Sequence, residues 1–114
     1  MSQSYAFFAL LRVHPNWLRL SRPERRRFEA ETLKPIYARY PAVRMRWFDA
    51  EAFTARCSDI ALFETESIKD FYYLIDALRD SPLLTEPYFE FVDILPAVED
   101  GFRDYDAQLS TGGS

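Results

Sequence analysis

The sequence predicts an α+β fold in which four strands and two helices follow one another in a fixed order. Four stretches alternate in hydrophobicity with the period-two pattern of a strand. Two stretches with apolar residues at helical spacing separate the first strand from the second and the third from the fourth. The order strand, helix, strand, strand, helix, strand is that of a ferredoxin-like domain, a four-stranded antiparallel sheet with both helices on one face. The predicted strands are Tyr5–His14, Val43–Asp49, Asp59–Thr65 and Tyr88–Leu95.

The first helix is predicted from about Arg22 to Tyr40. Ser21 and Glu24 have the spacing of a capping box, in which each side chain accepts a hydrogen bond from the other residue's backbone N–H. Pro35 lies inside this helix, lacks a backbone N–H, and should kink the helix or divide it in two. The expected apolar stripe consists of Phe28, Thr32, Ile36 and Tyr40.

The second helix is predicted to begin at Ser67 and to stop at Ser81-Pro82. The stretch 50–58 has no clear period and is expected to be a loop between the second and third strands. The last strand should end at Pro96. We therefore expect one domain over residues 1–114, with an ordered core of about 4–97 and a C-terminal extension, 98–114. The expected stripe of the second helix is Phe71, Leu74, Ile75 and Leu78.

Composition and charge narrow the classes of partner. The chain has 114 residues, a net charge of −4 and 48% hydrophobic residues, which are typical of a globular domain. The acidic balance argues against nucleic acid, because binding a duplex requires a basic surface. Apolar runs stay well below the ~20 residues of a membrane-spanning helix. We expect no nucleic-acid or membrane partner and a cytoplasmic location.

The sequence also lacks the usual signatures of a bound cofactor. It has one histidine, one cysteine and no spacing typical of metal ligands. Its three glycines form no phosphate-binding loop, so a nucleotide cofactor is not expected. The single cysteine, Cys57, follows Arg56 but has no second histidine to serve as its base, so we interpret it as a buried or loop thiol. The prediction is therefore a protein without a cofactor.

Two amphipathic helices should cover the more uniformly apolar face of the sheet. The other face then carries an aromatic patch that is larger than a monomer should expose, which predicts a homodimer sealed sheet to sheet. The alternative is that the strands simply favour aromatic residues. The helix-covered face is expected to hold Phe7, Ala9, Leu11, Val13, Val43, Met45, Trp47, Ile60 and Leu62. The open face is expected to hold Phe8, Leu10, Arg12, His14, Arg44, Arg46, Phe48, Asp59, Ala61 and Phe63.

Antiparallel pairing should bring polar groups together at one end of this open face. The predicted catalytic residues are His14, as the proton-transfer group, and Asp59. Guanidinium groups bind carboxylates and enolates well, so an anionic or carbonyl-bearing aromatic ligand is expected. The alternative is that Asp59 only neutralises an arginine at a subunit interface. The predicted substrate-binding residues are Arg12, Arg46, Phe48 and Phe63.

Several motifs resemble the darcynin-like family of small bacterial proteins. They are Pro15-Asn16-Trp17-Leu18, Trp47-Phe48-Asp49-Ala50-Glu51-Ala52-Phe53, Leu74-Ile75-Asp76-Ala77-Leu78-Arg79-Asp80-Ser81-Pro82, and Tyr88-Phe89 with Ile94-Leu95-Pro96-Ala97. The resemblance covers nearly the whole chain. It implies no catalytic residues, because the family has no general assigned function. At the level of the fold, the chain looks like the dimeric α+β barrel group, which includes cofactor-free monooxygenases, isomerases and cyclase-like enzymes.

Two functions follow as hypotheses. The first is a small cofactor-free enzyme that acts by proton transfer, cyclisation or oxygenation on an aromatic or polyketide-like metabolite. The second is a non-enzymatic ligand-binding or dimeric assembly module. A closed cavity of a few hundred Å³ would favour the enzyme, whereas charged pairs between chains with no cavity behind them would favour the module.

Overall fold

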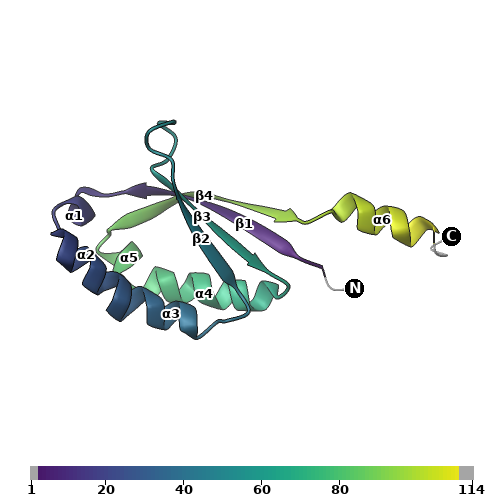
Figure 1. Ribbon diagram of the computed structural model, residues 1–114, viewed down its shortest axis with the longest axis horizontal. Coiled ribbons are helices and arrows are strands. Elements are labelled where there is room, and N and C mark those ends of the chain that lie inside the picture. The colour runs from purple at the N-terminus through teal and green to yellow at the C-terminus, as the bar shows by residue number, and fades with distance from the viewer. Residues whose placement is uncertain (1–2, 111–114) are drawn as a thin grey trace.

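A computed structural model describes residues 3–110. Four antiparallel strands form one sheet in the order β2-β3-β1-β4, and helices cover one of its faces (Figure 1). This arrangement confirms the predicted ferredoxin-like α+β fold. The elements are β1 (Tyr5–Val13), α1 (Pro15–Leu18), α2 (Arg22–Phe28), η1 (Glu29–Leu33), α3 (Lys34–Ala38), β2 (Arg44–Asp49), β3 (Asp59–Thr65), α4 (Ile68–Asp80), α5 (Pro82–Thr85), β4 (Phe89–Val98) and α6 (Gly101–Ser110).

The first helical stretch runs without a break from Arg22 to Ala38, but its hydrogen-bond pattern changes next to Pro35, where the sequence predicts a kink or a division. It begins with the expected capping box, in which Ser21 Oγ accepts from Glu24 N at 3.2 Å and Glu24 Oε1 accepts from Ser21 N at 2.8 Å. The two hydrogen bonds with Ser21 lower the pKa of Glu24. One turn before Pro35 the helix widens into the π-turn η1, where Lys34 N donates to Glu29 O. Proline cannot continue the α-helical hydrogen-bond ladder, and the wider turn accommodates the missing donor.

The π-turn changes which side chains reach the core. It inserts one extra residue, so the buried stripe moves from the predicted Thr32 to Leu33. Leu33 and Ile36 are buried, whereas Thr32 is only half-buried. The prediction for Thr32 is therefore wrong by one position. As a consequence, Glu29, Leu33 and Tyr37 line the same space above the sheet.

The register of β3 corrects the predicted faces of the sheet. In antiparallel strands, residues directly opposite each other share a face. Phe63 lies opposite Phe7, Ala61 opposite Ala9, and Asp59 opposite Leu11. Asp59, Ala61 and Phe63 therefore lie on the helix-covered face, and Ile60 and Leu62 lie on the open face; the prediction for this strand is wrong. β3 is a central strand that is apolar on both faces, so alternation could not orient it.

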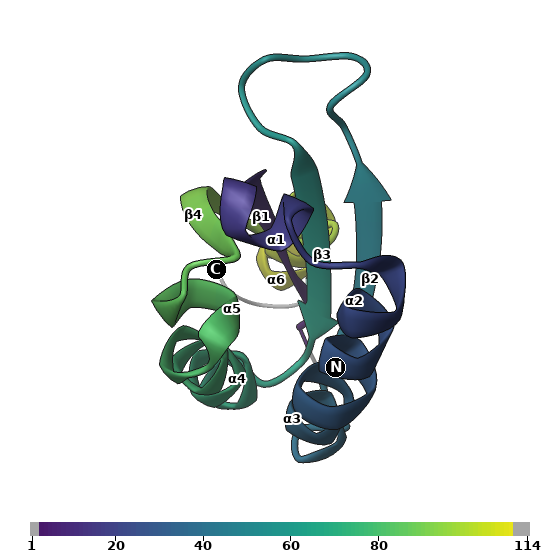
Figure 2. The same ribbon diagram turned by 90° about the vertical axis from the view of Figure 1, so that its left-hand side faces the viewer.

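The assignments for β1 and β2 are confirmed. Phe7, Ala9 and Leu11 are buried under the helices. Met45 and Trp47 lie opposite Phe63 and Ala61 and therefore share the helix-covered face. The core also contains the four predicted residues of α4, namely Phe71, Leu74, Ile75 and Leu78. Figure 2 shows the two helical stretches, α2–α3 and α4–α5, beside each other against the sheet.

The C-terminal part of the chain leaves the compact body. β4 runs to Val98, past the predicted end at Pro96, and it is an edge strand, where a proline is tolerated. α6 then stands away from the sheet, and the structure measures 59 × 32 × 19 Å (Figure 1). The radius of gyration of 16.9 Å exceeds the ~13 Å of a compact chain of this length. None of the residues of α6 is buried. The last four residues of the predicted extension lie outside the described residues.

Candidate functional site

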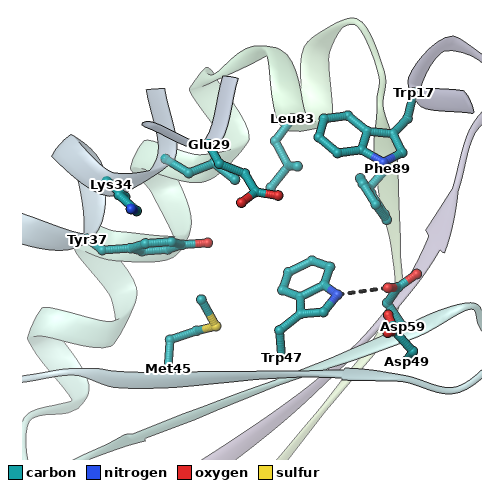
Figure 3. A pocket seen from close by; sticks show the side chains of 11 residues that line it. Trp17, Glu29, Lys34, Tyr37, Met45, Trp47, Asp49, Asp59, Leu83 and Phe89 are labelled. Carbon is teal, nitrogen blue, oxygen red and sulfur yellow. Dashed lines mark hydrogen bonds between the residues drawn. The ribbon is translucent and has the colours of Figure 1, made fainter. Parts of the chain in front are cut away.

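A cavity of about 510 Å³ lies between the sheet and the helices (Figure 3). β2 and β3 form its floor, the π-turn region of the first helical stretch forms one wall, and α1, α5 and the start of β4 close the other end. Its volume falls in the range of small-molecule sites, ~300–1,000 Å³. The lining residues are Trp17, Glu29, Leu33, Lys34, Tyr37, Met45, Trp47, Asp49, Asp59, Leu83 and Phe89.

Asp59 is the most tightly held polar group of the cavity. Trp47 Nε1 donates a hydrogen bond to Asp59 Oδ2 at 2.7 Å, from β2 to the neighbouring β3. Asp59 is only 9% exposed, and Phe89 packs edge-on against the Trp47 ring at 5.7 Å. A buried carboxylate is costly unless hydrogen bonds compensate its lost hydration. The indole N–H therefore fixes a carboxylate in an otherwise aromatic wall.

A second carboxylate stands directly opposite the first. Asp49 pairs with Asp59 in the β2–β3 register, so the two side chains share the helix-covered face. Both line the cavity. Like charges directly opposite each other in a sheet are destabilising. The fold thus keeps a concentrated negative charge at this end of the cavity.

The helical wall adds a hydroxyl and two further charges. Tyr37 points its hydroxyl into the cavity, and Glu29 approaches the same space from the π-turn (Figure 3). Burial, reinforced by the negative charge of Glu29, raises the pKa of Tyr37 to about 12. The hydroxyl therefore stays protonated at neutral pH and can donate a hydrogen bond. Lys34, at the C-terminal end of the π-turn, supplies the single cation among the lining residues.

Among residues 3–110, no group of three or more His, Cys, Asp and Glu side chains is arranged to hold a metal ion. Within the same range, no helix is both long and apolar enough to cross a bilayer.

The predicted partners of Asp59 lie elsewhere. Arg12 donates to the carbonyl oxygens of Ala55 at 3.4 Å and Arg56 at 2.6 Å, which ties the β2–β3 loop to β1. His14 Nε2 and Arg12 Nε lie 3.5 and 3.9 Å from Glu90 Oε1 on β4. The structure thus brings Arg12 and His14 together, as predicted, but around Glu90 and not around Asp59.

The other predicted binding residues also do not form one site with Asp59. Arg46 pairs with Glu64 at 3.4 Å and lies 5.7 Å from the centre of the Phe48 ring, on the open face. Phe63 is 1% exposed and belongs to the core under the helices. A single site built from all six predicted residues is therefore wrong. The one-residue error in the facing of β3 moved Asp59 and Phe63 to the opposite side of the sheet.

Most of the cavity was missed by the sequence predictions. Glu29, Leu33 and Tyr37 recur at four-residue spacing, one position after the predicted stripe. This spacing is the sequence feature that could have indicated the helical wall of the cavity. Met45, Trp47 and Asp49 alternate along the predicted strand Val43–Asp49, and the assignment of Met45 and Trp47 to the helix-covered face was correct. Trp17, Leu83 and Phe89 reach the cavity only through tertiary packing, so no local pattern could have indicated them.

The fold and the cavity define a ferredoxin-like protein with a small-molecule-sized space between its sheet and its helices. Residues 2–111 match the family model Darcynin, described as a domain of unknown function. The chain therefore belongs to the Darcynin family, and the resemblance noted in the sequence is confirmed.

Relatives from several bacteria are similar over much of the chain. A protein called Darcynin from Chromobacterium violaceum is 86% identical over 78 residues, which are 68% of this chain and 99% of that protein. Darcynin 1 from Acinetobacter baumannii is 53% identical over 88 residues, 77% of this chain and 98% of that protein. A Darcynin homolog from Streptomyces avermitilis is 40% identical over 96 residues, 83% of this chain and 78% of that protein.

Solved structures share the fold at low identity. A novel heme-binding protein from Thermus thermophilus matches with a TM-score of 0.77 and 16% identity over 92% of this chain. A mutant chlorite dismutase from Candidatus Nitrospira defluvii matches with a TM-score of 0.72 and 14% identity over 96% of this chain. The chain spans only 44% and 48% of those two proteins. At this identity the likeness establishes the fold alone.

Proposed function

We propose that the protein binds a flat aromatic metabolite in the helix–sheet cavity and acts on it by proton transfer, with Asp59 as the proton acceptor. One observation carries the proposal. In a cavity of about 510 Å³ walled mainly by aromatic and aliphatic side chains, a carboxylate with 9% exposure is held in place by an indole N–H at 2.7 Å. Such apolar pockets with a few positioned polar groups are the usual form of a small-molecule site.

The shape and lining of the cavity favour an aromatic ligand. Trp17, Tyr37, Trp47 and Phe89 surround the space, with Met45 on its floor (Figure 3). Aromatic rings prefer offset-stacked or edge-on contacts with other rings, and they contribute ~0.5–1.5 kcal/mol per pair beyond buried area. A methionine side chain is flexible enough to fill irregular gaps, and its sulfur makes favourable contacts with aromatic rings.

Proton transfer follows from the two polar groups that face the ligand. The Asp59 carboxylate can take a proton from an O–H or N–H group of the ligand, and Trp47 keeps that carboxylate in position. Tyr37 can donate a hydrogen bond to a second atom of the ligand, because its pKa is raised to about 12. Both roles are performed by side chains of this chain, so the proposed proton transfer uses no cofactor.

Haem, which the Thermus thermophilus neighbour is named for, does not fit these residues. The lining contains neither histidine nor cysteine, and His14 lies beside Glu90 outside the cavity. Tyr37 is a poor iron ligand while it keeps its proton, and its raised pKa favours that form. Three carboxylates and one lysine face the cavity, a charge balance opposed to the anionic propionates of haem. We therefore propose no haem-dependent step.

The indole N–H groups of the two tryptophans provide a test of ligand binding in the cavity. Both tryptophans of the chain line the cavity, so both indole N–H signals in a ¹H–¹⁵N spectrum report on its occupancy. We expect titration with 2-naphthalenemethanol, a neutral aromatic alcohol, to shift both signals with saturation. Asp59→Asn should weaken binding about 10- to 100-fold, since a hydrogen bond to a charged group contributes ~1.5–3 kcal/mol.

The matched control is Asp76→Asn, the same change at an exposed position on α4. It should bind like the wild type. Absence of any saturable shift of either indole signal would contradict the proposed function.

We also propose that the chain forms a homodimer, as an assembly role in addition to ligand binding. The open face exposes Phe8, Phe48 and Leu95, at 38, 44 and 49%. α6 adds Phe102, Tyr105 and Leu109, spaced at i, i+3 and i+7 on a helix with no buried residue. A helix with an unpacked apolar stripe is only marginally stable alone. A second copy of the chain would cover both surfaces, and the Arg12–His14–Glu90 group would then lie at the interface.

Light scattering tests the dimer. At micromolar concentration we expect twice the monomer mass of 13.4 kDa. Tyr105→Ser should shift the protein toward monomer. Tyr72→Ser on α4 is the matched control, because Tyr72 and Tyr105 are both 61% exposed. A wild-type monomer at this concentration would refute the dimer and leave the cavity proposal intact.

A further inference from the structure

We infer that the cavity selects an aromatic ligand that carries a positively charged nitrogen, a protonated amine or a cationic heterocycle. This inference rests on the proposed function and names the ligand class for the same site. Three carboxylates, those of Glu29, Asp49 and Asp59, face a single ammonium group, that of Lys34.

Among residues 3–110, none of the ion pairs reaches a cavity carboxylate. They involve Arg12, Arg46 and Arg103, and the contact of His14 with Glu90 also lies elsewhere. Figure 3 places Lys34 at the other end of the cavity from Asp49 and Asp59. The negative charge at the Asp49–Asp59 end is therefore available to a ligand.

Burial strengthens the interactions of the Asp59 charge. Asp59 is 9% exposed, and the rings of Trp47 and Phe89 lie beside it. Charges interact more strongly in such surroundings than in water, because the effective dielectric constant is lower. A cation entering this end would lose hydration but gain two opposed carboxylates, Asp49 and Asp59.

The aromatic walls favour the same ligand charge. The face of an aromatic ring attracts cations, and tryptophan does so most strongly. The protein already uses this interaction beside the cavity, where the Arg25 guanidinium lies 5.8 Å from the Trp17 ring centre. Trp47 brings a second indole ring to the carboxylate end of the cavity.

The same charges stabilise the protonated form of the ligand. If a protonated amine gave its N–H proton to the Asp59 carboxylate, the N–H bond would break, an O–H bond would form, and ligand and side chain would both be neutral. Glu29 and Asp49 would oppose that loss of positive charge, because nearby opposite charges favour the charged form. The cavity therefore favours binding of the cation.

Three naphthalene probes of nearly equal size test this inference. They are 2-naphthylmethylammonium, 2-naphthalenemethanol and 2-naphthoate, which differ chiefly in charge. Dissociation constants come from the indole N–H signals of the wild-type chain and from titration calorimetry. We expect the ammonium probe to bind at least tenfold more tightly than the alcohol, and the naphthoate to bind most weakly.

Variants then locate the source of the preference. Asp49→Asn and Glu29→Gln are isosteric changes at exposed positions, so the fold should tolerate them. Each should reduce the preference for the ammonium probe over the alcohol at least threefold. Asp76→Asn should alter neither.

The outcomes separate the two proposals. Binding of the alcohol or the naphthoate as tightly as the ammonium probe would overturn the charge selectivity and leave the cavity as an aromatic site. Failure of all three probes to bind would overturn the proposed function and this inference together. A preference for the ammonium probe that survives both variants would overturn the roles of Asp49 and Glu29.

Discussion

Replacing Trp47 with phenylalanine removes one hydrogen bond from the cavity while keeping an aromatic ring. Trp47 Nε1 donates to Asp59 Oδ2 at 2.7 Å, and Asp59 is 9% exposed. A hydrogen bond to a charged group contributes about 1.5–3 kcal/mol, and a buried acceptor left without its partner adds a desolvation cost. Trp47 itself is 36% exposed, so water can replace part of the lost bond. We therefore expect a loss of about 1.5–2 kcal/mol in the free energy of unfolding from this bond.

Urea denaturation at pH 7 measures this loss, and Trp17→Phe is the matched control. It makes the same side-chain change in the same cavity, but no hydrogen bond from Trp17 Nε1 is present among residues 3–110. Both variants lose ring area, and Trp17 has the more extensive ring contacts, with Phe28, Tyr88 and Phe89. Its loss therefore gives an upper value for the packing part of the change. A Trp47→Phe loss within about 0.5 kcal/mol, the range of an ordinary surface change, would refute the anchoring role of Trp47.

Two further measurements test the core and the cavity wall. Leu11→Ala and Leu78→Ala should each lower the free energy of unfolding by about 2–5 kcal/mol, because these side chains are 1% and 2% exposed. Leu95→Ala, at 49% exposure, should stay within about 0.5 kcal/mol in the same denaturation experiment. Tyr37 should titrate near pH 12 in ultraviolet absorbance, and Glu29→Gln should bring its pKa closer to 10. Because the folded state holds this proton more tightly, stability should fall between about pH 10 and pH 12 by roughly 2–3 kcal/mol, and a flat profile would contradict the burial of Tyr37.

The order of elements could be predicted because each element carries its own local signal. Alternation marks the strands, and the Ser21 capping box marks the start of the first helix. Pro35 correctly indicated where the regular helix is disturbed. These features depend on neighbours in the chain, so no knowledge of the tertiary structure was needed.

The orientation of β3 depends on the tertiary structure. Ala61 and Phe63 are each 1% exposed, and Leu62 on the other face is 7% exposed, so buried apolar residues lie on both faces in the middle of this strand. The alternation of hydrophobicity that orients β1 is absent there. The pairing of Asp59 with Leu11 decides the face. This single ambiguity displaced the predicted site from the helix-covered side to the open side.

The cavity-lining residues of the first helical stretch could not be predicted for a different reason. A regular helix would bury the stripe that contains Thr32, but the π-turn moves the stripe to Leu33. Glu29 and Tyr37 thereby line the cavity together with Leu33. Proline predicts a disturbance in a helix, but it does not predict whether the helix kinks, breaks or widens.

A crystal structure of the chain with bound 2-naphthylmethylammonium would locate the ligand. We expect density for the naphthalene ring between the sheet and the helices, against Trp47 and Phe89. The nitrogen should lie within hydrogen-bond distance of Asp59. Density on the open face, against Arg12, His14 or Arg46, would show that the cavity is not the binding site.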